Sequence, residues 1–125
     1  MVLFSASSQA EIVIIGNKDN SLLFDIKQLE DIFLGRTHSL SNGHVVLPLD
    51  HALLRAEFYQ KLTARPIEQI NAYWARIVFT GQATPPIVLP DDKAILLTVS
   101  KNKDAIGYID KKYLNNTVRV LYLLN

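Results

Sequence analysis

Short apolar, β-branched runs alternate along this chain with segments whose apolar residues recur at helical spacing. Residues 11–15 (EIVII) show no polar alternation, which predicts a strand buried on both faces. Further strands are predicted over residues 44–49, 105–109 and 117–124. Gly107 lies inside the strand predicted at residues 105–109, and a glycine there indicates that another part of the chain comes close.

Two helices are predicted in the first half of the chain. Residues 26–34 have an apolar face, with Asp25 as the N-cap and Gly35 placed to end the helix. Residues 52–62 follow Asp50, and apolar residues recur there at every fourth position. Each of these helices therefore has one side suited to packing on a sheet.

Two more helices are predicted in the second half of the chain. The first covers residues 66–79 and begins at Pro66, a residue favoured at the first helical position. The second covers residues 92–100, where aspartates put negative charge near the positive end of the helix dipole. Residues 81–90 contain three prolines and are expected to be an extended loop. Strands alternating with helices predict an α/β fold with helices packed on a sheet.

Composition limits the possible functions. The chain has 125 residues, a single-domain length, and 49% of them are hydrophobic, enough for one core. Its formal net charge is +1 and it has no basic stripe, so nucleic acid is not an expected partner. No segment approaches the roughly 20 apolar residues of a membrane span. The absence of cysteine excludes disulfides, thiol catalysis and thiolate metal ligands.

Residues 1–10 differ from the rest of the chain. Three apolar residues are followed by small polar ones, and Ser8, Gln9 and Ala10 form a small-x-small pattern. This pattern is typical of the end of a secretory signal peptide and predicts a periplasmic or otherwise extracytoplasmic location. The alternative is a disordered tail. Residues 11–125 are expected to form the single domain.

No arrangement of residues indicates catalysis. The chain has three histidines, His38, His44 and His51, and none lies three or four residues from another. No glycine-rich phosphate loop or paired-carboxylate signature is present. Asp50 and His51 could be combined with Ser39 or Ser41 as a hydrolytic triad, but neither serine has a nucleophile-elbow context. An enzyme, a metal site and a bound cofactor are therefore not expected.

One feature of the sequence indicates binding. The strand that ends near Asp50 runs straight into a helix, and unpaired amides at a helix start attract anions. We expect an anion over the amides of His51, Ala52 and Leu53, with Arg55 one turn further on. The alternative is that Asp50 is an N-cap that uses these amides itself, while Arg55 is a surface residue.

Two segments of the chain resemble a known family. Residues 29–36 (LEDIFLGR) are similar to the LxxIFLGK segment of the substrate-binding proteins of phosphate ABC transporters, and residues 105–109 (AIGYI) to their GAIGYV segment. Residues 73–86 resemble short, stand-alone members, and the likeness covers about residues 11–121. It implies one lobe of a type II periplasmic binding protein, three-layer-like, with a mixed central sheet and flanking helices. The full-length proteins have two lobes that close on phosphate.

The resemblance carries over few phosphate contacts. The family segment R-S-D-G-S-G-T-T-F corresponds to residues 48–56, where Asp50 keeps the aspartate and Pro48 stands at the arginine. The family's Ser-Gly-Thr positions are apolar here: Ala52, Leu53 and Leu54. Each lost charge-assisted hydrogen bond removes about 1.5–3 kcal/mol of binding free energy. The resemblance therefore implies the fold, and only weak phosphate binding.

Two functions remain open at this point. The first is a non-enzymatic, extracytoplasmic solute-binding-like domain that binds phosphate or another small anion weakly through Asp50, His51, Ala52, Leu53 and Arg55. The second is a protein-interaction module that kept the lobe and lost the ligand, with a protein partner or a homodimer. It predicts an exposed patch that includes Tyr59, Tyr73 or the Pro85–Pro86 pair, although such aromatics also occur in ordinary packing.

Overall fold

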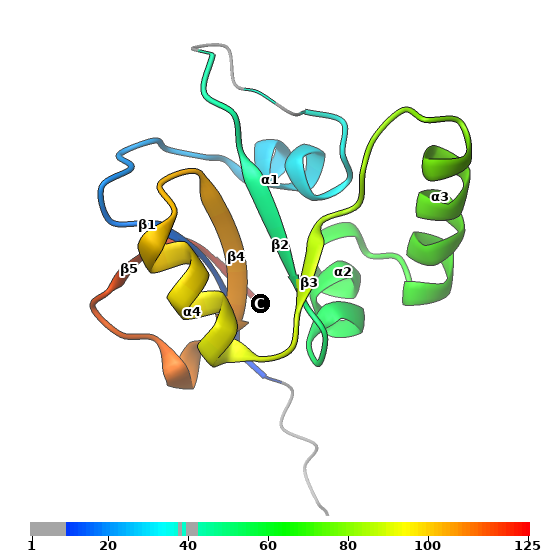
Figure 1. Cartoon of the computed structure of the whole chain (residues 1–125). Helices are drawn as coiled ribbons and strands as arrows, with labels where there is room; N and C mark the ends of the chain where they lie inside the picture. Colours follow the sequence, from blue (N-terminus) through cyan, green and yellow to red (C-terminus); the bar gives the residue numbers. More distant parts are fainter. Residues whose placement is uncertain (1–9, 38, 40–42) are drawn as a thin grey trace, which may run out of the picture.

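The computed structural model describes residues 10–37, 39 and 43–125. All but the last residue of the expected signal-peptide segment (residues 1–10) therefore lies outside the described residues, as do His38 and Ser41. A five-stranded sheet has the strand order β3-β2-β4-β1-β5 (Figure 1). The strands are β1 (Ile12–Asn17), β2 (Leu47–His51), β3 (Ile87–Leu89), β4 (Ala105–Asp110) and β5 (Val118–Leu124). The helices are α1 (Ile26–Phe33), α2 (Arg55–Thr63), α3 (Ile67–Phe79) and α4 (Asp92–Lys101), with a 3-10 turn, η1 (Lys111–Tyr113).

The sheet is mixed, as expected. Strand β1 pairs antiparallel with β4 and β5, whereas β2 is parallel to β3 and β4. Helix α4 covers one face, and α1 and α2 cover the other, with α3 packed beside α2 (Figure 1). The three-layer arrangement confirms the predicted α/β fold.

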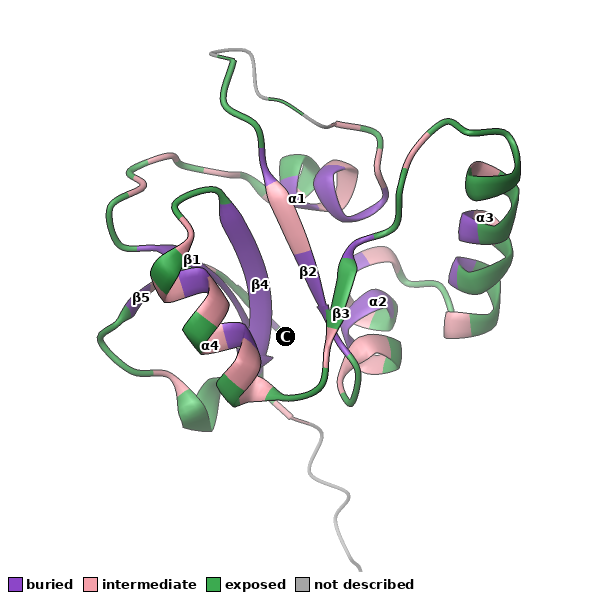
Figure 2. Ribbon diagram, viewed as in Figure 1, coloured by how far each residue is buried: buried purple, intermediate pink, exposed green. Residues whose placement is uncertain are grey.

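Strand β1 shows why its sequence lacks polar alternation. Ile12 and Ile14 belong to the core cluster beneath α1 and α2, whereas Val13 and Ile15 belong to the cluster beneath α4. Figure 2 shows the same burial along β4, the strand beside it. A central strand covered on both faces needs an apolar residue at every position.

Helix α1 follows its local sequence signals. The Asp25 carboxylate accepts a hydrogen bond from the Gln28 amide, and the Gln28 side chain accepts one from the Asp25 amide. These two bonds are a capping box. Gly35 follows the helix at φ +71°, and a Cβ there would lie 2.6 Å from Cη2 of Trp74. Both the turn conformation and the contact with α3 therefore require glycine at this position.

The region between β2 and α2 differs from its prediction. The strand predicted at residues 44–49 is β2, which extends to His51, and the helix predicted from residue 52 begins only at Arg55. Asp50 pairs with Val88 of β3, and His51 pairs with Leu89. Strand β3 lies in the proline-rich stretch that was expected to be loop only. The interpretation of Asp50 as a helix N-cap is wrong, because Asp50 lies in the sheet.

The start of α3 and the packing at Gly107 can also be compared with their predictions. Helix α3 begins at Ile67, one residue after the predicted start, and Pro66 is its N-cap. The close approach predicted at Gly107 is confirmed, because a Cβ there would lie 2.7 Å from Cγ2 of Ile95 in α4. Among the described residues, none of the helices has both the length and the apolar character that crossing a membrane requires.

Candidate functional site

The predicted binding residues meet where β2 ends and α2 begins, a segment that we call the β2–α2 corner (residues 50–55). Asp50 and His51 have 1% and 0% of their surface exposed. The Asp50 side chain contacts residues of α2 and β4, whereas that of His51 contacts α4. The sequence therefore correctly predicted that these residues lie close together. It predicted an open binding surface, however, whereas the side chains of Asp50 and His51 are buried.

Asp50 is the acceptor of a buried hydrogen-bond network. Its Oδ1 accepts from the hydroxyls of Tyr59 at 2.9 Å and Tyr108 at 3.0 Å. Its Oδ2 lies 3.3 Å from Nε of Arg55, whose Nη1 donates to Asn71 of α3 at 2.7 Å. Three elements, β2, α2 and β4, are thus joined through one carboxyl group.

Burial controls the titration of this network. Desolvation raises the pKa of the Asp50 carboxyl group, against the opposing effects of the Tyr59 hydroxyl and the positive charge of Arg55. Desolvation also raises the pKa values of Tyr59 and Tyr108, and the negative charge of Asp50 adds to this. Both phenols therefore stay protonated and act as donors to Asp50.

His51, and not Asp50, accepts hydrogen bonds from the amides of the turn that leads into α2, whose N-cap is Leu54. Nδ1 of His51 lies 3.1 Å from the Leu53 amide nitrogen and 3.3 Å from that of Leu54, and accepts from both. The Leu54 amide also lies 3.2 Å from the His51 carbonyl oxygen, and the Ala52 amide donates to the Leu89 carbonyl at 2.9 Å. Two of the three amides expected to bind an anion, those of Ala52 and Leu53, thus donate within the chain.

The neighbouring start of α4 is also occupied by the protein's own carboxylates. Asp91 accepts a hydrogen bond from the Ala94 amide at 2.9 Å, as an N-cap does. Asp92 Oδ1 accepts from the Asp110 amide at 2.8 Å, and its Oδ2 lies 3.2 Å from Nε2 of His51. The start of α4 therefore already faces negatively charged side chains of the protein, which disfavours an added anion there.

Among the described residues, those considered for a hydrolytic triad do not assemble one, and Ser41 lies outside the described part of the chain. Both ring nitrogens of His51 face protein groups, the amides on one side and Asp92 on the other. Ser39 forms an isolated β-bridge with Val45, which precedes β2, whereas His51 is the last residue of β2. The serine and the histidine therefore lie toward opposite ends of this strand. No three His, Cys, Asp or Glu residues group as metal ligands within the part of the chain that the structure describes.

The expected aromatic patch is largely absent, and other apolar residues are exposed instead. Tyr59 is fully buried, which corrects the expectation for this residue, and Tyr73 is half-buried and donates to the Leu34 carbonyl. Pro85 is exposed, whereas Pro86 is buried. Apolar residues are exposed at the end of α3 and on β3: Val78 (50%), Phe79 (92%), Ile87 (53%) and Val88 (54%).

Comparison with known proteins identifies the fold. No family model and no curated protein matches the sequence. An ABC-type phosphate transport receptor from Vibrio cholerae superposes with a TM-score of 0.69 and 15% identity, over 96% of this chain and 53% of that one. A putative phosphate ABC transporter substrate-binding protein with bound phosphate, from Clostridium perfringens, gives 0.68 and 18%, over 90% and 44%.

A third structure agrees with these two. PstS from Borrelia burgdorferi superposes with a TM-score of 0.64 and 14% identity, over 90% of this chain and 46% of that one. The chain thus spans about half the length of each solved structure, and its fold is that of one lobe of such a binding protein.

Proposed function

We propose that this chain is a non-enzymatic, extracytoplasmic domain with a phosphate-binding-protein fold that acts through contacts with protein. The main support is the state of the β2–α2 corner, where the Ala52 and Leu53 amides and the Asp50 carboxylate are all engaged within the chain. An oxyanion would have to displace these bonds and would then lie close to a buried carboxylate. The corner therefore holds the fold together and does not act as a solute site.

Calorimetry with inorganic phosphate and sulfate tests the first half of this proposal. At 10 mM of either anion, we expect no heat of binding and no shift in melting temperature relative to chloride at matched ionic strength. A site with a Kd of about 0.1 mM would add about 2.7 kcal/mol to the free energy of unfolding at this concentration. Such an increase is easily detected, and finding it would overturn the proposal.

Weak oxyanion binding by Asp50, His51, Ala52, Leu53 and Arg55 is the second candidate. The observation that favours it is Arg55, whose side chain lies at the corner with 24% of its surface exposed. One of the similar structures also contains bound phosphate. Under this alternative, titration gives a heat with phosphate that Arg55→Met abolishes. The two candidates therefore give opposite results in the same experiment.

Self-association tests the second half of the proposal, with a second copy of the chain as the partner. Strand β3 is an edge strand, and an unpaired edge can pair with the same edge of another copy. Light scattering over a concentration series should show a dimer that Phe79→Glu weakens by tenfold or more. Leu23, 86% exposed and ahead of α1, offers the matched control Leu23→Glu, which should dimerise like the wild type. A monomer at every concentration would contradict this result.

A further inference from the structure

His51 occupies an unusual position for a titratable group. It is fully buried, and its Nδ1 accepts hydrogen bonds from the Leu53 and Leu54 amides. An imidazole nitrogen that accepts cannot carry a proton, so the ring is neutral and its proton is on Nε2. That nitrogen lies 3.2 Å from Oδ2 of Asp92. One side chain thus connects the end of β2 with the starts of α2 and α4.

We propose that His51 is a proton-operated latch that holds the β2–α2 corner closed while it is neutral and opens it when Nδ1 is protonated. The step takes one proton from solvent and converts imidazole to imidazolium. The new N–H on Nδ1 faces the amide hydrogens of Leu53 and Leu54, so both hydrogen bonds to the ring are lost. The turn at residues 52–54 then has no side-chain cap.

Charged and aromatic groups from the neighbouring elements surround His51. Asp92 of α4 attracts the imidazolium, and the Tyr108 ring of β4 lies nearly parallel to the imidazole, with centroids 6.2 Å apart. Asp50, the preceding residue on β2, also attracts positive charge, but it is already neutralised by Arg55 of α2.

The loss of the two amide hydrogen bonds outweighs the attraction of Asp92 for the imidazolium. Asp92 has 17% of its side chain exposed, and its Oδ1 already accepts from the Asp110 amide, so Oδ2 alone faces His51. A donor forced against two donors loses both bonds and gains no acceptor. Acidification therefore opens the corner. Because α2 contributes Phe58 and Tyr59 to the core, its loosened start lowers the stability of the whole domain. This inference requires neither a ligand nor a partner.

The experiment compares melting temperatures at pH 7.5, 6.5 and 5.5 for the wild type and two variants. Asn accepts from the backbone amide two residues on and does not titrate, so His51→Asn can keep the bond to the Leu53 amide at every pH. Between pH 7.5 and 5.5 we expect the wild type to lose about 5 °C more than His51→Asn. Gln82→Asn, at an exposed residue outside the β2–α2 corner, is the control variant and should follow the wild type. Parallel curves for the wild type and His51→Asn would overturn the latch.

Amide hydrogen exchange on the wild type gives a second test, which does not depend on whether His51→Asn folds. Exchange at Leu53 and Leu54, corrected for the intrinsic effect of pH, should become about tenfold faster between pH 7.5 and 5.5. The amides inside α3 should change less, relative to their intrinsic rates, than those of Leu53 and Leu54. Unchanged protection at Leu53 and Leu54 would exclude the latch, even if the melting temperature falls.

Discussion

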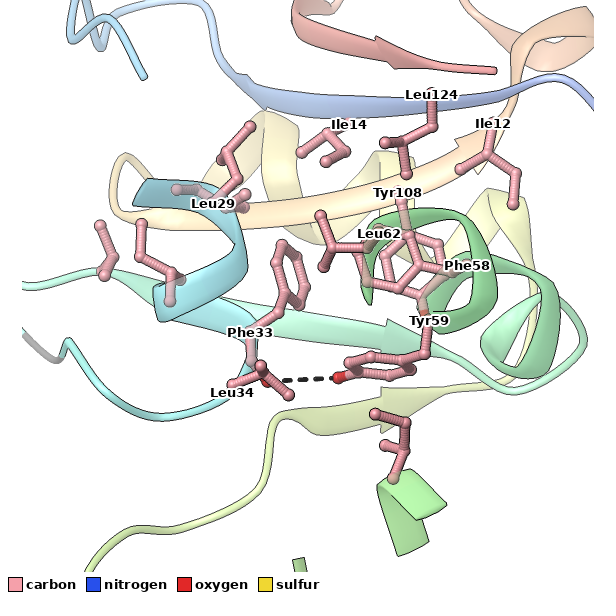
Figure 3. Packing of buried hydrophobic residues seen from close by; sticks show 14 of the residues in the cluster. Ile12, Ile14, Leu29, Phe33, Leu34, Phe58, Tyr59, Leu62, Tyr108 and Leu124 are labelled. Carbon is pink, nitrogen blue, oxygen red and sulfur yellow. Dashed lines mark hydrogen bonds between the residues drawn. The ribbon is translucent and has the colours of Figure 1, made fainter. Parts of the chain in front are cut away.

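Replacing Phe58 with alanine is expected to lower the free energy of unfolding by about 3–5 kcal/mol, the usual range for a buried aromatic residue. Phe58 is fully buried, and its ring stacks on Tyr108 with centroids 3.5 Å apart. It also meets the rings of Phe33 at 4.8 Å and Tyr59 at 5.1 Å edge to face (Figure 3). Alanine would leave a cavity between α1, α2 and β4, because the rings around it are held by their own contacts.

Urea unfolding followed by circular dichroism measures this loss, and the chain offers a matched control. Leu23 has 86% of its surface exposed ahead of α1, so Leu23→Ala should change the free energy of unfolding by less than about 0.5 kcal/mol. If both alanine variants lost similar amounts of stability, the packing described for Phe58 would be wrong.

The parts of the fold that could be predicted from sequence are those controlled by neighbouring residues. The capping box at Asp25 and the glycine at position 35 determine where α1 begins and ends, and both signals lie within the helix or beside it. The unbroken apolar run of β1 likewise indicates burial on both faces. In α2, the four-residue spacing correctly placed Phe58 and Leu62 in the core.

The parts that could not be predicted depend on contacts between distant residues. Strand β3 has only three residues and follows two prolines, and it is a strand because β2 pairs with it. The same pairing extends β2 to His51 and delays the start of α2. Nothing near His51 in the sequence indicates that its ring, and not the Asp50 carboxylate, accepts from the amides of the turn before α2.

The β2–α2 corner was therefore predicted only in part. Asp50, His51 and Arg55 do lie together, as their spacing indicates, but their partners come from other elements. Tyr59, Tyr108 and Asp92 complete the network from α2, β4 and α4. One signal could have identified Tyr108: a tyrosine within a strand predicted to be buried needs a partner for its hydroxyl group.

Replacing Asp50 with alanine is expected to lower the free energy of unfolding by about 3 kcal/mol, since removal of one partner from a buried ion pair leaves the others uncompensated. The Tyr59 and Tyr108 hydroxyls would lose the Oδ1 acceptor, and the Arg55 guanidinium would lose its carboxylate. Asp50→Asn should lose less, because an amide oxygen can still accept from both hydroxyls. Asp19→Ala, at an exposed aspartate, is the control and should lie within about 0.5 kcal/mol of the wild type.

The two Asp50 variants also separate the network from the charge. Because burial raises the pKa of Asp50 in the folded state, the fold favours the protonated carboxyl group. Its contribution to stability is complete below the ordinary pKa of 3.8 and is lost as the pH rises through the higher folded-state value. Asparagine does not titrate, so the stability deficit of Asp50→Asn should be largest near pH 3.5 and should shrink toward neutral pH. A deficit that grows with pH would mean that Arg55 and the tyrosines outweigh desolvation, and that the Asp50 carboxylate is stabilised by its burial site.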